Sequence, residues 1–241
     1  MILKNCSALL LMLLIFSNCK QEEPTYSKMI SECLEESRKN YLSTQTIRFF
    51  ENPLRKCLDE KFVNVKITDL VFVDRNGDSI RINDIEKPLY IQTFSRLAGE
   101  CFRELKSLNK LAEEYKGKVE FILLVENNPC ESNFQWKTSP DKCDPKYNEN
   151  LRIVHFEDDD AIDLKAGYGE LIQGIRNTQY PTCYYLNQDK TIFKITTIED
   201  ILIESNKLFS ENELLSDDQL SEKSFENRVP KIFEDFIEQN R

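Results

Sequence analysis

The sequence has very little histidine and glycine, and both shortages narrow the possible chemistry. The single histidine among 241 residues, His155, lies in the alternating run LRIVHF, which is typical of a β-strand. Acid–base catalysis by histidine therefore has one possible position and no evident partner. The six glycines form neither a phosphate-binding loop nor the nucleophile elbow of hydrolases.

Positive charge and long apolar stretches are also scarce. The net charge of -10 argues against nucleic acid or an anionic membrane surface as a partner. After the first 19 residues, no apolar stretch is long enough to span a bilayer. The remaining chain, 40% hydrophobic and 31% charged over the whole sequence, is typical of a globular protein with one core, or one core with an appended subdomain. The cysteine spacing fits no zinc motif, so no metal and no cofactor are predicted.

The first 19 residues have the pattern of an export signal. Lys4 provides a positive start, Ser7–Phe16 is an uncharged apolar run, and Ser17-Asn18-Cys19 closes it. The apolar run is too short to cross a membrane, as is usual for a cleavable signal. An ordinary signal peptide with a chance cysteine, or a short core helix, would have the same pattern.

The cysteine at this place resembles the lipobox of bacterial lipoproteins. The resemblance implies a signal peptide over residues 1–18, lipid on Cys19, and a tether over residues 19–25. Its acidic stretch Lys20-Gln21-Glu22-Glu23 resembles the surface-export tags of Bacteroidetes-type lipoproteins. We therefore expect a protein of the bacterial cell envelope. Lipid would anchor it to a membrane, the outer membrane by preference, facing the periplasm or the cell surface.

Six further cysteines indicate disulfides, because even sets of cysteine in exported proteins are usually paired. Cys130 and Cys143 would close a loop rich in proline, asparagine and lysine, which gains about 3 kcal/mol from closure in the chain-entropy model. Cys33 and Cys57 lie in two amphipathic helical patterns, and a bridge between them would join these patterns as a hairpin. The two patterns form a predicted N-terminal helical extension over residues 26–61.

The rest of the chain alternates between strand and helix patterns. A hairpin is predicted around Asn76-Gly77. Further strands and helices are predicted at 87–94 (strand), 99–118 (helix), 119–126, 151–156, 182–186 and 191–195 (strands), and 224–240 (helix). Strand–helix–strand followed by an antiparallel pair and a helix is an α/β arrangement with a mixed central sheet flanked by helices.

Several of these segments resemble the thioredoxin-like redoxins of the bacterial envelope. The hairpin VFVDRNGDSIRINDI, the strand KPLYIQTF, Cys101 opening a helix with Arg103-Glu104, and Tyr180-Pro181-Thr182 occur in the order found in that family. The resemblance implies a thioredoxin-like domain over residues 62–241, with a disulfide-loop insertion at about 127–150. It also implies a cis bond before Pro181, and a groove beside Pro181 in which Tyr180 and Thr182 help to bind a protein or an extended peptide.

The sequence departs from the family at the motif that performs thiol–disulfide exchange. The Cys-X-X-Cys tetrapeptide of the family corresponds here to Ala98-Gly99-Glu100-Cys101. Ala98 therefore stands in place of the first, attacking cysteine, and Cys101 in place of the second, buried one. Glu100 further disfavours a thiolate on Cys101 by like charge. Cys183, two residues after Pro181, would share its face of the strand and could approach Cys101. The two could form a disulfide, or pack as buried reduced thiols.

Two functions remain open at this point. The first is a binding or structural module with a degenerate redoxin site. The second is a thiol–disulfide oxidoreductase or peroxide reductant that uses Cys101 with or without Cys183 as catalytic residues. Exposure of Cys101 distinguishes them, because a thiol that performs exchange must be reachable.

Overall fold

The computed structural model describes residues 26–44, 53–67, 70–74, 77–95, 98–126, 146–156, 181–197, 200, 204, 208 and 216–241. Its helices include α2 (Tyr26–Thr44), α3 (Pro53–Phe62), α4 (Gly99–Glu114) and α8 (Asp217–Gln239), with a 3-10 turn at Ile82–Asp84. Its strands include β1 (Val71–Val73), β2 (Ser79–Arg81), β3 (Leu89–Phe94), β4 (Glu120–Glu126), β5 (Leu151–Phe156), β6 (Cys183–Leu186) and β7 (Ile192–Thr196).

Five of these strands form one mixed sheet in the order β5-β4-β3-β6-β7. β3 pairs in parallel with β4, and β4 with β5, whereas β6 is antiparallel to both β3 and β7. Helix α4 connects the parallel neighbours β3 and β4, as expected for a β-α-β unit. β1 and β2 pair separately as an antiparallel hairpin, with Gly77 at φ +85 in its turn. The predicted α/β class and thioredoxin-like strand arrangement are confirmed.

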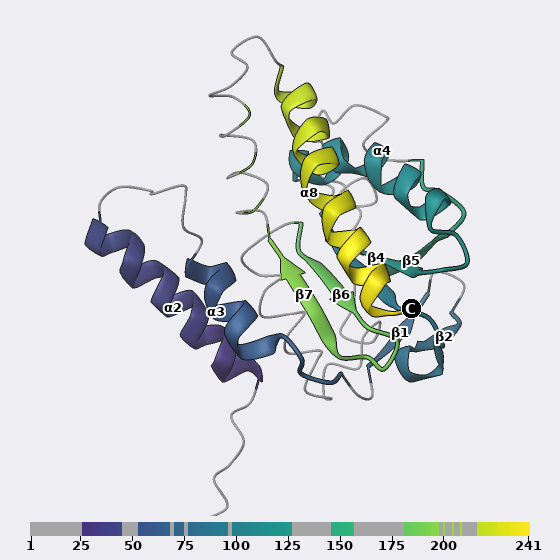
Figure 1. The fold of residues 1–241 in the computed structure, drawn as a ribbon, viewed down its shortest axis with the longest axis horizontal. Coiled ribbons are helices and arrows are strands. Elements are labelled where there is room, and N and C mark those ends of the chain that lie inside the picture. The colour runs from purple at the N-terminus through teal and green to yellow at the C-terminus, as the bar shows by residue number, and fades with distance from the viewer. Residues whose placement is uncertain are drawn as a thin grey trace, which may run out of the picture.

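The sheet separates two apolar cores, because successive side chains of a strand point to opposite faces. Leu89 and Ile91 of β3 pack into the core that contains α3 and the β1–β2 hairpin. Tyr90 and Phe94 of the same strand pack into the core beneath α4 and α8. Figure 1 shows α4 and α8 beside the sheet, with α2 and α3 beyond the edge strand β7.

The two helices over the second core follow from sequence pattern and capping. Cys101, Leu105 and Leu108 are buried on one face of α4, at the spacing of an amphipathic helix. α8 starts earlier than the predicted range of 224–240. Its start is set by a capping box, in which Ser216 and Gln219 satisfy each other's backbone N–H groups.

The predicted helical extension is stapled by a disulfide. Cys33 of α2 and Cys57 of α3 are bonded, with their Cα atoms 5.5 Å apart, which confirms the predicted bridge. α3 begins at Pro53, a favoured first residue because its missing N–H would have no helical partner. An ion pair between Lys61 and Glu32 also joins the two helices. α2 packs mainly on α3, and α3 packs on β7.

Several predicted features lie outside the described residues. They include the signal peptide and tether over 1–25, the lipidation site Cys19, the Cys130–Cys143 loop, and Tyr180 with its bond to Pro181. These stay predictions. Among the residues that are described, no helix is both long and apolar enough to cross a membrane.

Candidate functional site

Cys101 lies in the first turn of α4, directly after β3. Its backbone N–H donates to the carbonyl of Ala98 at 3.1 Å, and its side chain is 0% exposed. Ala98 is the N-cap residue, with an extended backbone and no side-chain hydrogen bond to the helix. The N-cap of this helix therefore carries a methyl group and no thiol.

Cys183 begins β6, opposite Gln92 of β3, and belongs to the same apolar core as Cys101. It is 2% exposed, and its Sγ lies 3.1 Å from the hydroxyl oxygen of Tyr90. Both cysteines are free thiols. The structure therefore brings the two predicted catalytic residues into one core but forms no disulfide between them, leaving the packed-thiol alternative.

The surroundings of both thiols oppose their ionisation. Burial, with a smaller contribution from the nearby Glu104 carboxylate, raises the pKa of Cys183 to about 12. Burial also raises the pKa of the Cys101 thiol. A backbone hydrogen bond from Ser95 lowers this pKa, and the negative charges of Glu104 and Glu100 raise it. Because the thiolate is the nucleophile in exchange, both groups are held in their unreactive form.

Glu100, which the sequence predicts to disfavour a Cys101 thiolate, lies at the mouth of this region. It pairs with Arg103 one turn later, with 2.6 Å between Oε1 and Nη1. Glu100 raises the pKa of Cys101, as expected, but this effect is smaller than those of burial and Glu104. The ion pair explains why, since Arg103 neutralises much of the carboxylate charge.

Pro181 and Thr182 are held tightly against the end of β3. The backbone N–H of Thr182 donates to Thr93 Oγ1 at 2.8 Å, and the Thr93 N–H donates to the Thr182 carbonyl at 2.9 Å. Pro181 is buried and Thr182 is 0% exposed. Two of the three predicted binding residues, Pro181 and Thr182, thus lie beside β3. The groove beside them stays a prediction.

A buried polar network that the sequence does not predict lies beneath the two thiols. Glu104 of α4, 0% exposed, accepts a hydrogen bond from Arg228 of α8 at 2.7 Å. Gln92 reaches the other oxygen of Glu104 at 3.5 Å, and the Tyr90 hydroxyl donates to Gln92 Oε1 at 2.7 Å. Because the same hydroxyl also lies 3.1 Å from Cys183, the network joins α8 to the thiol region.

Burial dominates the electrostatics of this network. It raises the pKa of Glu104 to about 7, although the positive charge and hydrogen bond of Arg228 act in the opposite direction. Burial lowers the pKa of Arg228, but the negative charge of Glu104, together with smaller contributions from Tyr185, Cys183 and Asp200, outweighs this effect and raises it. Arg228 therefore remains charged, while Glu104 can exchange a proton near neutral pH.

One signal in the sequence could have located Glu104. It falls three residues after Cys101, on the apolar face that includes Leu105 and Leu108, where a carboxylate needs a partner. Its partner is 124 residues away, so no local pattern identifies Arg228. Among the described residues, no group of three or more histidine, cysteine or acidic side chains is arranged to hold a metal ion.

Comparisons with known proteins give structural likeness without sequence matches. No family model matches the chain, and no curated protein is similar to it in sequence. Three solved structures that resemble it are described here. The exposed lipoprotein thioredoxin of Streptococcus pneumoniae shares 15% identity, with a TM-score of 0.36, over 52% of this chain and 86% of that one. A putative thiol:disulfide interchange protein DsbE from Chlorobium tepidum shares 9%, with a TM-score of 0.40, over 61% and 92%.

The third is the thioredoxin domain of a thiol-disulfide oxidoreductase from Bacteroides vulgatus. It shares 14% identity, with a TM-score of 0.40, over 70% of this chain and 96% of that one. These likenesses are distant and concern the fold. The assignment of the fold rests on strand order and on the position of α4 after β3.

Proposed function

We propose that this protein is a membrane-anchored envelope lipoprotein whose thioredoxin-like domain is a binding or structural module without dithiol exchange. The observation that carries the proposal is the complete burial of Cys101 behind Ala98, at the helix start where exchange would occur. A thiol with no exposed surface and a raised pKa cannot attack a disulfide at a useful rate. The groove beside Pro181 is the proposed place for a protein or extended-peptide partner.

The proposed location has two supports. The first is the lipobox-like start with Cys19 after an apolar run. The second is the Cys33–Cys57 disulfide, because such bonds persist in oxidising compartments such as the bacterial periplasm or cell surface. Mass spectrometry of the purified protein should find acyl chains on Cys19, and Cys19→Ser should release the protein from the membrane fraction. A Cys19→Ser protein that stays in the membrane fraction would contradict the anchor.

The reactivity of the thiols tests the functional part of the proposal. The native protein would be treated with an alkylating reagent, then unfolded without reductant, treated again with an isotopically distinct reagent, and mapped by peptide. We expect Cys101 and Cys183 to carry only the second label, and Cys33 and Cys57 to carry neither label without reduction. We also expect no reduction of insulin by the dithiothreitol-treated protein above the buffer rate.

The opposite result would favour the oxidoreductase. In that case Cys101 and Cys183 form a disulfide that yields to mild reductant while the Cys33–Cys57 bridge resists it. Rapid alkylation of Cys101 in the native protein would have the same meaning, since it requires an accessible thiolate. Either finding would overturn the binding-module proposal.

A further inference from the structure

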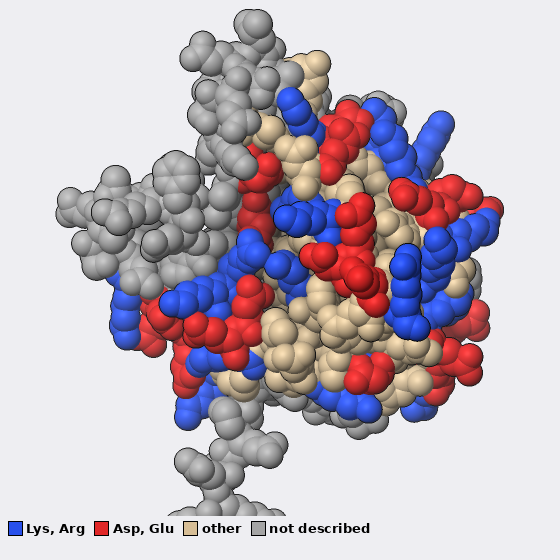
Figure 2. All heavy atoms as spheres, in the orientation of Figure 1, with Lys and Arg blue, Asp and Glu red and all other residues tan. Residues whose placement is uncertain are grey.

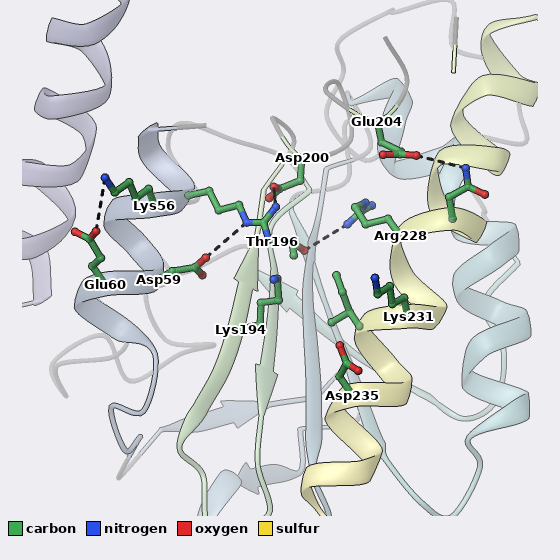
Figure 3. A pocket seen from close by; sticks show the side chains of 13 residues that line it. Lys56, Asp59, Glu60, Lys194, Thr196, Asp200, Glu204, Arg228, Lys231 and Asp235 are labelled. Atoms are coloured by element: carbon green, nitrogen blue, oxygen red, sulfur yellow. Dashed lines mark hydrogen bonds and ion pairs between the residues drawn. The ribbon is translucent and has the colours of Figure 1, made fainter. Parts of the chain in front are cut away.

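A groove of about 600 Å³ lies between α3, β7 and α8, outside the thiol region (Figure 3). Ten of its thirteen lining residues are charged, five of each sign, and Ile232 is its one aliphatic residue. Ligand pockets are usually lined mainly by apolar side chains. On the face shown in Figure 2, positive and negative side chains are interspersed and do not form a patch of one sign.

Several of the lining charges are already paired with each other. Arg55 lies 3.1 Å from Asp200 and 3.6 Å from Asp59. On α3, Lys56 and Glu60 are 4.0 Å apart. The first of these pairs joins α3 to a residue that follows β7, and the other two lie within α3. Together they leave little net charge on the α3 side of the groove.

Lys194 at the floor of the groove is different. It comes from β7 and points into the space between α3 and α8 (Figure 3). Its ammonium makes no hydrogen bond or ion pair with any residue in the described ranges. Burial lowers its pKa, Arg55 adds to this effect, and the carboxylates of Asp59, Asp200 and Asp235 oppose it from a distance. A half-buried ammonium without a contacting anion is unfavourable, so this position favours an anionic group from a ligand.

Carboxylates line both walls of the same groove. Asp235 of α8 is exposed and makes no ion pair with a described residue, and Asp59 lies on the α3 side of Lys194. Arg228, also on the α8 wall, already pairs with Glu104. A ligand with one sign of charge would satisfy part of this set and be repelled by the rest.

We propose that this groove binds a zwitterionic ligand of the amino-acid or short-peptide class. The carboxylate of the ligand lies against Lys194, and its ammonium lies toward the exposed carboxylate of Asp235 on the α8 wall. The volume suits such a ligand, since small-molecule sites range from about 300 to 1,000 Å³. The site exists only because the disulfide-stapled extension supplies α3 as one wall. It is separate from the proposed groove beside Pro181.

Isothermal titration of the intact protein with tri-alanine tests this proposal. Tri-alanine has two opposite charges at its termini and small side chains, so binding reports on the termini. We expect saturable binding with a dissociation constant of about 1 mM or tighter. N-acetyl tri-alanine and tri-alanine amide, which each lack one charge, should bind at least about tenfold more weakly.

Variants assign the two arms of the site. Lys194→Met keeps most of the apolar stem and should weaken tri-alanine binding about tenfold. Asp235→Asn should weaken tri-alanine more than N-acetyl tri-alanine, because only the former has an ammonium. Lys223→Met is the matched control, since Lys223 is exposed on α8 outside the groove. Circular dichroism should show that all three variants remain folded.

Three outcomes would overturn the proposal. One is the absence of saturable binding at about 10 mM tri-alanine. Another is equal binding of the blocked peptides, which would mean that the terminal charges are not recognised. The third is equally strong binding of acetate or inorganic phosphate at Lys194, which would make the groove a simple anion site.

Discussion

The two pairs of cysteines in the described part of the chain serve opposite purposes. Cys33 and Cys57 form a covalent bridge in the peripheral helical extension, where α2 packs mainly on α3. Cys101 and Cys183 remain thiols in the core beneath α4 and α8. The same residue type is therefore a cross-link in one region and a small apolar side chain in the other.

This difference follows from what each region offers its side chains. The outermost helix gains few tertiary contacts, so a bridge that restricts the unfolded chain contributes much of its stability. Around Cys183 the aromatic rings of Tyr90, Tyr185 and Phe233 lie 5.1 to 5.5 Å apart, and their packing holds the core without a bridge. The core has a different sensitive element, the buried pair of Glu104 and Arg228.

Breaking that pair should give the largest effect on stability. Arg228→Met leaves Glu104 buried without its cation, and removal of one partner of a buried pair typically costs about 3–5 kcal/mol. Urea unfolding at about pH 8, where Glu104 is ionised in the native protein, measures this loss. The double variant Arg228→Met with Glu104→Gln should recover part of it, since no uncompensated charge remains. A loss below about 1 kcal/mol for the single variant would show that the pair does not hold α8 against α4.

Removing the peripheral bridge should cost somewhat less and act locally. Replacement of both Cys33 and Cys57 by alanine removes a cross-link between residues 24 apart, worth about 3 kcal/mol in the chain-entropy model. Hydrogen exchange should accelerate in α2 well before it does in β3 or β4. Cys183→Ala is the contrasting change, and it should leave exchange in α2 unaltered. Equal acceleration throughout the sheet would mean that the extension and the core unfold as one unit.

Glu104 should also make the core, but not the extension, sensitive to pH. Its pKa rises from 4.5 to about 7 on folding, so the folded protein holds more protons than the unfolded chain between these values. Its contribution to the free energy of unfolding is therefore complete below about pH 4.5 and is lost as the pH rises through 7, by at most about 3 kcal/mol.

The measurement is a difference between two proteins at two pH values. Between about pH 5 and pH 8, the wild type should lose stability relative to Glu104→Gln, which cannot ionise there. Urea unfolding of both proteins cancels the other titrating groups. Parallel changes in the two proteins would mean that Glu104 ionises as freely in the fold as in the unfolded chain.

The elements predicted from sequence are those determined by neighbours in the chain. The segments KPLYIQTF and VEFILLVE predict two strands on either side of a helix, and the pattern around Cys33 and Cys57 predicts helices whose bridge the structure contains. The prediction that Ala98 stands in place of an attacking cysteine likewise rests on one tetrapeptide, and it stays a prediction.

Features that depend on distant segments could not be predicted in this way. Glu104 and Arg228 meet only because α8 folds back over α4, and Arg55 meets Asp200 across 145 residues. The charged groove between α3 and α8 depends on how the extension sits against β7, which no periodicity encodes. The polar network beneath the two thiols could therefore not be predicted from local sequence.

The smallest effect on stability, and the clearest change in chemistry, is expected from Ala98→Cys. Ala98 is partly buried at the N-cap of α4 and cysteine is only slightly larger than alanine, so the substitution should change the free energy of unfolding by no more than about 1 kcal/mol. The new thiol would face the unpaired N–H groups of the helix start, where thiolates of Cys-X-X-Cys motifs have a pKa of about 3.5 to 7.5. The rate of alkylation against pH should show such a thiol, and mild oxidation should join it to Cys101. Ala98→Ser is the control without a thiol. If the thiol introduced at position 98 alkylates no faster than an ordinary cysteine and forms no bridge, more than one residue prevents exchange at this site. The contrast between the disulfide-linked extension and the thiol core would then rest on the whole environment of Cys101.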